Sequence, residues 1–181
     1  MSPELKAFFS KVTQDPSLQQ KLYVTKELTD VARIAQDAGF QVTAAELLRA
    51  QAGRVLSLPL EELQDLAAGR KAAHGAQWGR GGKGYLDRAG FWLFELQQWG
   101  NTHHAVPHSE IVRFLFQATE DKELRIKLLN AKTCDDIALL AEMYGYSISG
   151  VDLLRYQAAR ILELDEQQAE NVARGAGSRV S

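Results

Sequence analysis

The chain has one cysteine, Cys134, and no long apolar run. A single cysteine excludes an internal disulfide and is typical of a reducing compartment. No stretch approaches the roughly 18 apolar residues of a membrane span. The N-terminal MSPELKAFFSKV carries charges where a secretory signal would be continuously apolar. We therefore expect a cytosolic protein.

Neither positive nor negative charge predominates. The net charge is −2, so nothing in the overall balance favours nucleic acid or an anionic membrane as a partner. Strand-like alternation is confined to the short connections Phe40–Val42 and Tyr146–Ile148. Apolar residues recur instead at helical spacing along most of the chain. These observations predict an all-α fold.

The chain does contain an internal repeat. LLRAQAGRVLSL, from Leu47 to Leu58, recurs as LLRYQAARILEL from Leu153 to Leu164, an offset of 106 residues. The same offset pairs, without a gap, Glu4 with Glu110, Phe8 with Phe114, Asp15 with Asp121, Asp30 with Asp136, and Gly39 with Gly145. Such a match indicates duplication. We expect two similar helical modules in tandem, 1–69 and 107–176, joined by segment 70–106 and followed by a tail, 177–181.

Helix caps divide each module. Ser2-Pro3 and Asp15-Pro16 each combine an N-cap residue with a proline at the first helical position. Gly39 ends a helix, Thr43 caps the long helix from Ala44, and Pro59 opens a last short helix ending near residue 69. The predicted buried faces are Leu5, Phe8, Phe9 and Val12; Val31, Ile34, Ala35 and Ala38; and Leu47, Leu48, Gln51, Ala52, Val55 and Leu56.

A family resemblance follows from this pattern. The first copy combines Phe8, Asp15, Leu18, Leu22, Asp30-Val31, Ala35-x-x-Ala38-Gly39-Phe40, Leu47-Leu48 and a closing LPLEELQDLAAG. The second copy has Asp121, Leu124, Leu128, Asp136-Ile137, Ala141, Gly145-Tyr146 and Leu153-Leu154. Both copies resemble the Nif-eleven family, a short helical domain common in cyanobacteria. The resemblance covers about three quarters of the chain and lies in core and cap residues.

The resemblance implies a role in peptide modification. Domains of this family often serve as the leader of a ribosomally made peptide, which a maturase binds while it alters the core peptide after a glycine-rich end. Here only Ser178–Ser181 follow Gly175-Ala176-Gly177, and no cysteine is present there to form a thioether ring. Segment 70–106 also has no cysteine, and a second module follows it. We therefore expect a protein-binding module rather than a precursor.

Segment 70–106 differs from both modules. It holds all three tryptophans, five basic residues against two acidic ones, and the glycine-rich GRGGKG. A predicted helix from Asp87 to Gly100 places Trp92, Leu96 and Trp99 on one face, with Phe91 and Phe94 beside them and Arg88 at its start. Two interpretations stay open: this helix fills the groove between the modules, or it offers an aromatic anchor to another protein.

Other candidate sites are incomplete. GRGGKG lacks the first glycine and the Ser or Thr of a phosphate-binding loop, although its charge beside Trp78 leaves weak RNA contact as an option. His103, His104 and His108 lie near Pro107 without a metal-ligand pattern. Cys134 aligns with Leu28 and is best interpreted as a packing residue. We expect no metal, no cofactor and no catalytic site.

A polar set recurs along the long helix of each copy. Gln51 and Gln157 interrupt the apolar stripe, and arginines recur at 49 and 155 and at 54 and 160. In a structural interpretation, each glutamine makes a hydrogen bond to a neighbouring helix, and the aliphatic part of each arginine side chain packs along the apolar stripe. In a functional interpretation, the two copies offer matched surfaces to a repeated or two-fold partner.

Together these features predict a non-catalytic adaptor, assembly factor or accessory subunit of a bacterial cytosol. Its partner would be another protein with an acidic or two-fold repeated surface. The expected anchors are Trp92, Trp99, Phe91, Phe94 and Arg88, followed by Arg49, Arg54, Arg155 and Arg160. The alternatives are a leader-type substrate or decoy of a peptide-modifying enzyme and, from another class, an enzyme or metal protein.

Overall fold

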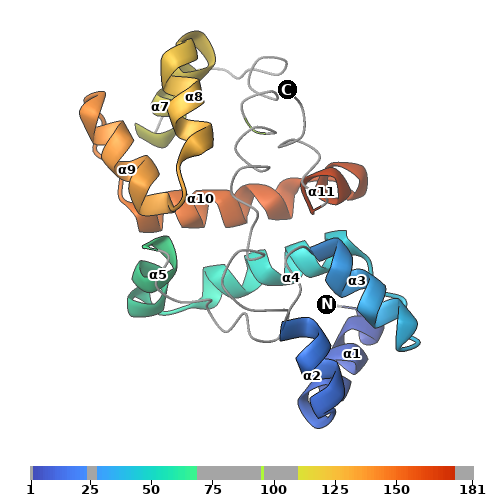
Figure 1. Cartoon of the computed structure of the whole chain (residues 1–181). Coiled ribbons are helices and arrows are strands. Elements are labelled where there is room, and N and C mark those ends of the chain that lie inside the picture. Colours follow the sequence, from blue (N-terminus) through green and yellow to red (C-terminus); the bar gives the residue numbers. More distant parts are fainter. Residues whose placement is uncertain (1, 24–27, 69–94, 96–109, 174–181) are drawn as a thin grey trace.

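A computed structural model describes residues 2–23, 28–68, 95 and 110–173, and every regular element in this part is an α-helix (Figure 1). The first module holds α1 (Pro3–Gln14), α2 (Pro16–Tyr23), α3 (Leu28–Asp37), α4 (Ala44–Ser57) and α5 (Leu60–Ala67). The second holds α7 (Glu110–Glu120), α8 (Lys122–Asn130), α9 (Cys134–Met143), α10 (Gly150–Glu163) and α11 (Glu166–Ala173). The predicted all-α fold of two tandem modules is confirmed.

Most helix ends follow from local sequence. The side chains of Ser2 and Thr43 accept hydrogen bonds from backbone N–H groups in the first turns of α1 and α4. The long helix of the second module starts with a full capping box between Ser149 and Asp152. Gly39 and Gly145 have φ angles of +97° and +91°, which only glycine adopts at little cost.

The predicted faces form the cores of the modules, with two exceptions. Phe8 and Phe114 are both fully buried, each with an aromatic ring (Phe40 or Tyr146) packed against it. Ala38 is exposed because α3 ends one residue earlier, at Asp37, so the helical period no longer applies to it. Leu56 is 45% exposed, and the apolar spacing therefore extends one residue beyond the buried face of α4. For these two residues the predicted burial was wrong.

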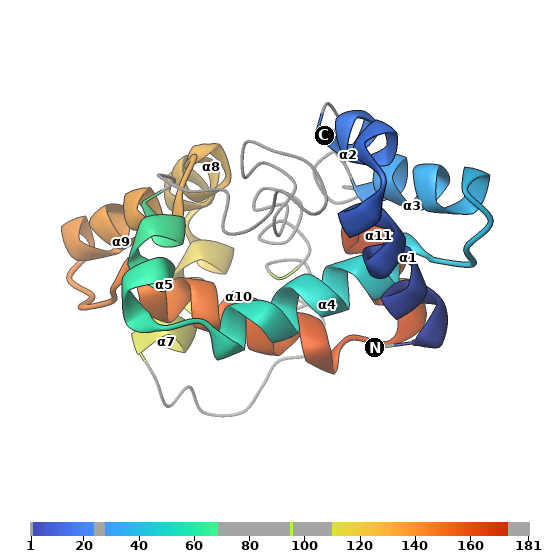
Figure 2. The same ribbon diagram turned by 90° about the horizontal axis from the view of Figure 1, so that it is seen from below.

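The long helices of the two modules pack against each other. Figures 1 and 2 show α4 and α10 side by side across the middle of the molecule, running in opposite directions. Their buried stripes correspond residue by residue at the 106-residue offset: Ala44, Ala45, Leu47, Leu48, Gln51, Ala52 and Val55 match Gly150, Val151, Leu153, Leu154, Gln157, Ala158 and Ile161. The repeated helix thus builds an approximately two-fold interface between the copies.

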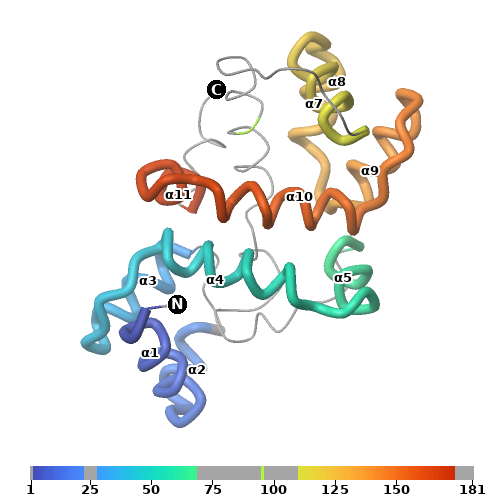
Figure 3. Tube along the Cα trace, turned by 180° about the vertical axis from the view of Figure 1, so that it is seen from behind, coloured from blue at the N-terminus to red at the C-terminus, as the bar shows by residue number. Residues whose placement is uncertain are grey.

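Each module also packs its last helix on the other module. Helix α5 contacts α10, and α11 contacts α4, so α5 lies at the end of the molecule that carries α9 (Figure 3). The approach is close, since a Cβ added to Gly150 in α10 would lie 3.1 Å from Cβ of Ala67 in α5. At the other end, the backbone N–H of Ala45 in α4 donates to Glu170 of α11 at 2.8 Å. The last helix of each module therefore packs against the long helix of the other module.

Candidate protein-binding surfaces

The four repeated arginines differ in whether they meet a carboxylate. Arg49 pairs with Glu166 of α11 at 2.6 Å, and its other terminal nitrogen donates to the carbonyl of Leu164. Arg155, the counterpart of Arg49, is exposed and has no ion pair within the described ranges. At the 106-residue offset, position 166 corresponds to position 60, which is a leucine. One arginine of this pair therefore joins α4 to α11, while the other is available at the surface.

The second arginine pair shows the same contrast. Arg160 in α10 donates from Nε and Nη2 to the two carboxylate oxygens of Glu95, each at 2.9 Å. Glu95 is 1% exposed and also accepts a hydrogen bond from the Tyr156 hydroxyl. The hydrogen bonds to Glu95 hold the pKa of Arg160 above its ordinary value, although burial opposes this effect. Glu95, which belongs to segment 70–106 between the modules, is thus bound to the second module.

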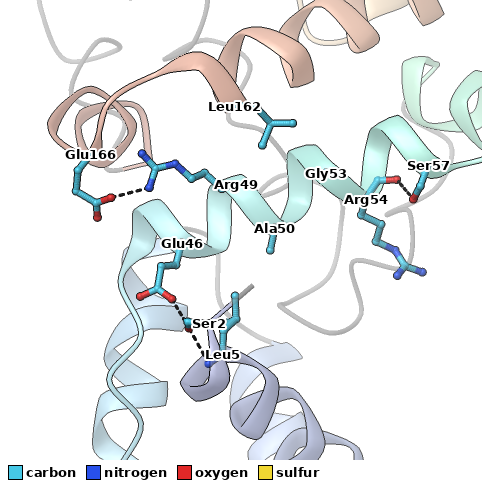
Figure 4. Close-up of a pocket in the computed structure, with 10 residues that line it drawn as sticks. All are labelled: Ser2, Leu5, Glu46, Arg49, Ala50, Gly53, Arg54, Ser57, Leu162 and Glu166. Atoms are coloured by element: carbon cyan, nitrogen blue, oxygen red, sulfur yellow. Dashed lines mark hydrogen bonds and ion pairs between the residues drawn. The ribbon is translucent and has the colours of Figure 1, made fainter.

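Arg54, the counterpart of Arg160, lies in an open pocket on α4. The pocket holds about 780 Å³, and its lining is Ser2, Leu5, Glu46, Arg49, Ala50, Gly53, Arg54, Ser57, Leu162 and Glu166. Figure 4 shows the Arg49 guanidinium reaching Glu166, whereas that of Arg54 extends from α4 toward neither glutamate. Nε of Arg54 is buried without a hydrogen-bond partner. A buried donor of this kind is unfavourable until an acceptor reaches it.

A third surface is apolar and lies on α9. Leu139 and Met143 are 61% and 75% exposed, and both line a shallow hollow of about 510 Å³ rimmed by Lys127 and Lys132. Two more large apolar side chains of this module, Phe116 and Ile126, are 43% and 49% exposed. We call Leu139, Met143 and this hollow the α9 surface. Exposed apolar groups that gather in one place mark interaction sites more often than scattered ones do.

The first module lacks these apolar groups. At the 106-residue offset, Leu139 and Met143 correspond to Arg33 and Asp37, and both of those residues are exposed. Phe116 and Ile126 correspond to Ser10 and Gln20. The α9 surface is therefore a property of the second copy rather than of the repeated fold.

The glutamines of the stripe are buried as predicted, at 1% exposed for Gln51 and 0% for Gln157. Gln51 makes a polar interaction, whereas neither amide atom of Gln157 has a hydrogen-bond partner. Cys134 is 1% exposed, as its alignment with Leu28 predicts.

Several predicted residues lie outside the described part of the chain. They include the aromatic anchors and Arg88, the GRGGKG stretch and the histidines: Arg88, Phe91, Trp92, Phe94, Trp99, His74, His103, His104 and His108. Among the described residues, no cluster of three or more His, Cys, Asp or Glu residues is placed to hold a metal ion. No helix of that part is both long and apolar enough to cross a membrane.

A comparison with protein families agrees with the repeat. The model of the Nif11 domain matches residues 2–47 and 108–153, two ranges offset by the same 106 residues. They comprise 92 of the 181 residues (46 in each range) and run from the start of each module into its long helix. No solved structure matches the chain. The chain therefore belongs to the Nif11 domain family, the Nif-eleven family of the resemblance, and carries the leader-peptide-like domain twice.

Proposed function

We propose that this chain is a non-catalytic protein-binding adaptor whose second module binds a nonpolar segment of another protein on the α9 surface. The observation that carries the proposal is the exposure of Leu139 and Met143 beside a shallow hollow. Burying a leucine or methionine side chain contributes about 1.5–3 kcal/mol, so two such side chains can anchor an interface. The adaptor acts in the cytosol.

The difference between the copies supports this proposal. The first module carries Arg33 and Asp37 on the same helical positions, so α9 needs no apolar residue there to form or to pack. Leu139 and Met143 add little to stability while they face solvent. Their apolar character is therefore better explained by a partner than by the fold.

The first copy also supplies the test. In Leu139→Arg/Met143→Asp, the second module receives the residues that the first module tolerates at these positions. The control is Ile126→Gln, which also takes the first-copy residue but lies outside the α9 hollow. We expect affinity capture from native cytosol, read by mass spectrometry, to recover one stoichiometric partner with the wild type and the control and to lose it with the double variant. Loss with the control alone would refute binding at α9.

A second candidate function is a leader-type substrate or decoy of a peptide-modifying enzyme. The Nif11 match over both modules is the observation that favours it. Under this alternative, the protein binds a maturase, and co-expression with that enzyme adds a mass change within residues 70–106 or the tail, 177–181. If the mass of both segments is unchanged and a partner is captured through the α9 surface, the leader-type alternative is refuted and the adaptor function is supported.

A further inference from the structure

The approximate two-fold relation between the modules places two equivalent arginines in unlike surroundings. Arg54 on α4 corresponds to Arg160 on α10 at the 106-residue offset. The residues around them correspond too: Ala50 with Tyr156, Gly53 with Ala159, Ser57 with Glu163, and Leu162 with Leu56. The pocket on α4 is therefore the first-module counterpart of the place where Glu95 binds α10.

On α10 this place binds a carboxylate tightly. Glu95 receives two parallel hydrogen bonds from Arg160 and one from Tyr156, and it is almost completely buried. Paired donation from a guanidinium to a carboxylate is among the strongest and most directional polar contacts in proteins. The long helix of this module thus accepts a glutamate when the chain supplies one.

On α4, Nε of the corresponding Arg54 is buried without an acceptor. Of the charged residues that line the pocket, Arg49 and Glu166 neutralise each other, and Glu46 accepts the Ser2 hydroxyl at 2.6 Å. Glu46 keeps its negative charge, so the lining as a whole is neutral. Of its two arginines, Arg54 is the one that has no ion pair with a described residue. The side chain at the position of Tyr156 is smaller on α4, where Ala50 stands. Leu5, Ala50 and Leu162 add apolar surface beside the guanidinium.

We propose that the α4 pocket binds a glutamate of another protein, held by Arg54 as Glu95 is held by Arg160, with apolar residues of the same segment packed against Leu162 and Ala50. The pocket shares no residue with the α9 surface. It is a second binding site, on the first module, and its test is separate from that of the adaptor function.

The probe is a fluorescein-labelled peptide with the sequence of residues 88–98, extended by two lysines for solubility. The glutamate in this sequence is the one that α10 binds, and the matched peptide has glutamine in its place. Fluorescence anisotropy with the full chain measures both affinities. We expect the glutamate peptide to bind at least about tenfold more tightly than the glutamine peptide, a ratio that corresponds to about 1.4 kcal/mol.

Three variants locate the effect. Arg54→Ala should abolish the preference for glutamate. Arg54→Lys should reduce it, since lysine keeps the charge but lacks the two parallel N–H donors of the guanidinium. Tyr156→Phe on α10 should leave the preference unchanged. Far-UV circular dichroism checks that each variant is folded. Equal binding of the two peptides, absence of binding by either, or a preference that survives Arg54→Ala would each overturn the proposal. A preference that falls with Tyr156→Phe would place the binding on α10 and overturn it as well.

Discussion

The contact between Glu95 and Arg160 predicts an unequal cost for removing its two members. Glu95 is 1% exposed and accepts three hydrogen bonds, two from Arg160 and one from the Tyr156 hydroxyl. Arg160→Met would leave it as a buried charge with the Tyr156 hydroxyl as its one remaining donor among these. Removing one member of a buried ion pair costs about 3–5 kcal/mol, because the other charge stays desolvated. We therefore expect Arg160→Met to lower the free energy of unfolding by an amount in this range.

Glu95→Gln should cost less. The side chain of Arg160 is 28% exposed and still has Glu163 at 3.0 Å, so its charge is not stranded when Glu95 becomes neutral. The loss is then that of hydrogen bonds to a charged group, about 1.5–3 kcal/mol. The two variants should differ by roughly 1.5–2 kcal/mol, the difference between the two ranges.

Urea unfolding followed by far-UV circular dichroism measures both free energies, with equal slopes required for the comparison. The matched control is Arg54→Met, which removes the equivalent arginine from α4. Arg54 has no acidic partner among the described residues and its Nε is buried without an acceptor, so this change should not destabilise the chain and should stabilise it by about 1 kcal/mol or less. An equal cost for Arg160→Met and Arg54→Met would show that Glu95 does not anchor its segment to α10.

Three further predictions concern buried and helical positions. Gly53→Ala in α4, where an added Cβ meets nothing within 4 Å, should raise thermal stability by about 0.5–1 kcal/mol, whereas Gly145→Ala, at φ +91°, should lower it by about 1–2 kcal/mol. Gln157→Met should stabilise the chain to urea by about 1 kcal/mol, since it removes an unpaired buried amide, but Gln51→Met should destabilise it by a similar amount. Gly150→Leu should displace the Asp135 side chain of α9, whose Oδ1 would lie 1.9 Å from the added Cβ, and press on Ala67 of α5. It should therefore lower the urea midpoint, a result that unchanged unfolding would contradict.

The features that the sequence predicts correctly are those that depend on residues close together in the chain. Ser2, Thr43 and Gly39 act within one turn of their own helices, so their roles can be read from adjacent residues. The 106-residue offset likewise reveals the number of modules without any knowledge of their contacts. The errors at Ala38 and Leu56 arise where a helix ends and its period stops describing burial.

The arrangement of the modules could not be predicted in the same way. The ion pairs of Arg49 and Arg160 join residues 117 and 65 positions apart, and both depend on how the copies pack. The recurrence of arginine was visible in the sequence, but which copy meets a carboxylate was not. One indication was available for α9: Leu139 and Met143 replace Arg33 and Asp37. A comparison of positions where the copies differ, rather than where they match, would have identified that surface.

The differences between the copies explain why a tandem chain can do more than a pair of identical modules. Two identical modules in a two-fold pair would present each surface twice and bind the same partner at both ends. Here the buried stripes of α4 and α10 correspond, which holds the pair together, while several residues outside the stripes differ, such as Ala50 and Tyr156 or Ser57 and Glu163. Arg160 holds a carboxylate of the chain itself, Arg54 faces an open pocket, and the α9 surface belongs to the second copy. Under the function proposed above, fusing the modules would allow one molecule to hold two different partners at once, one on each module.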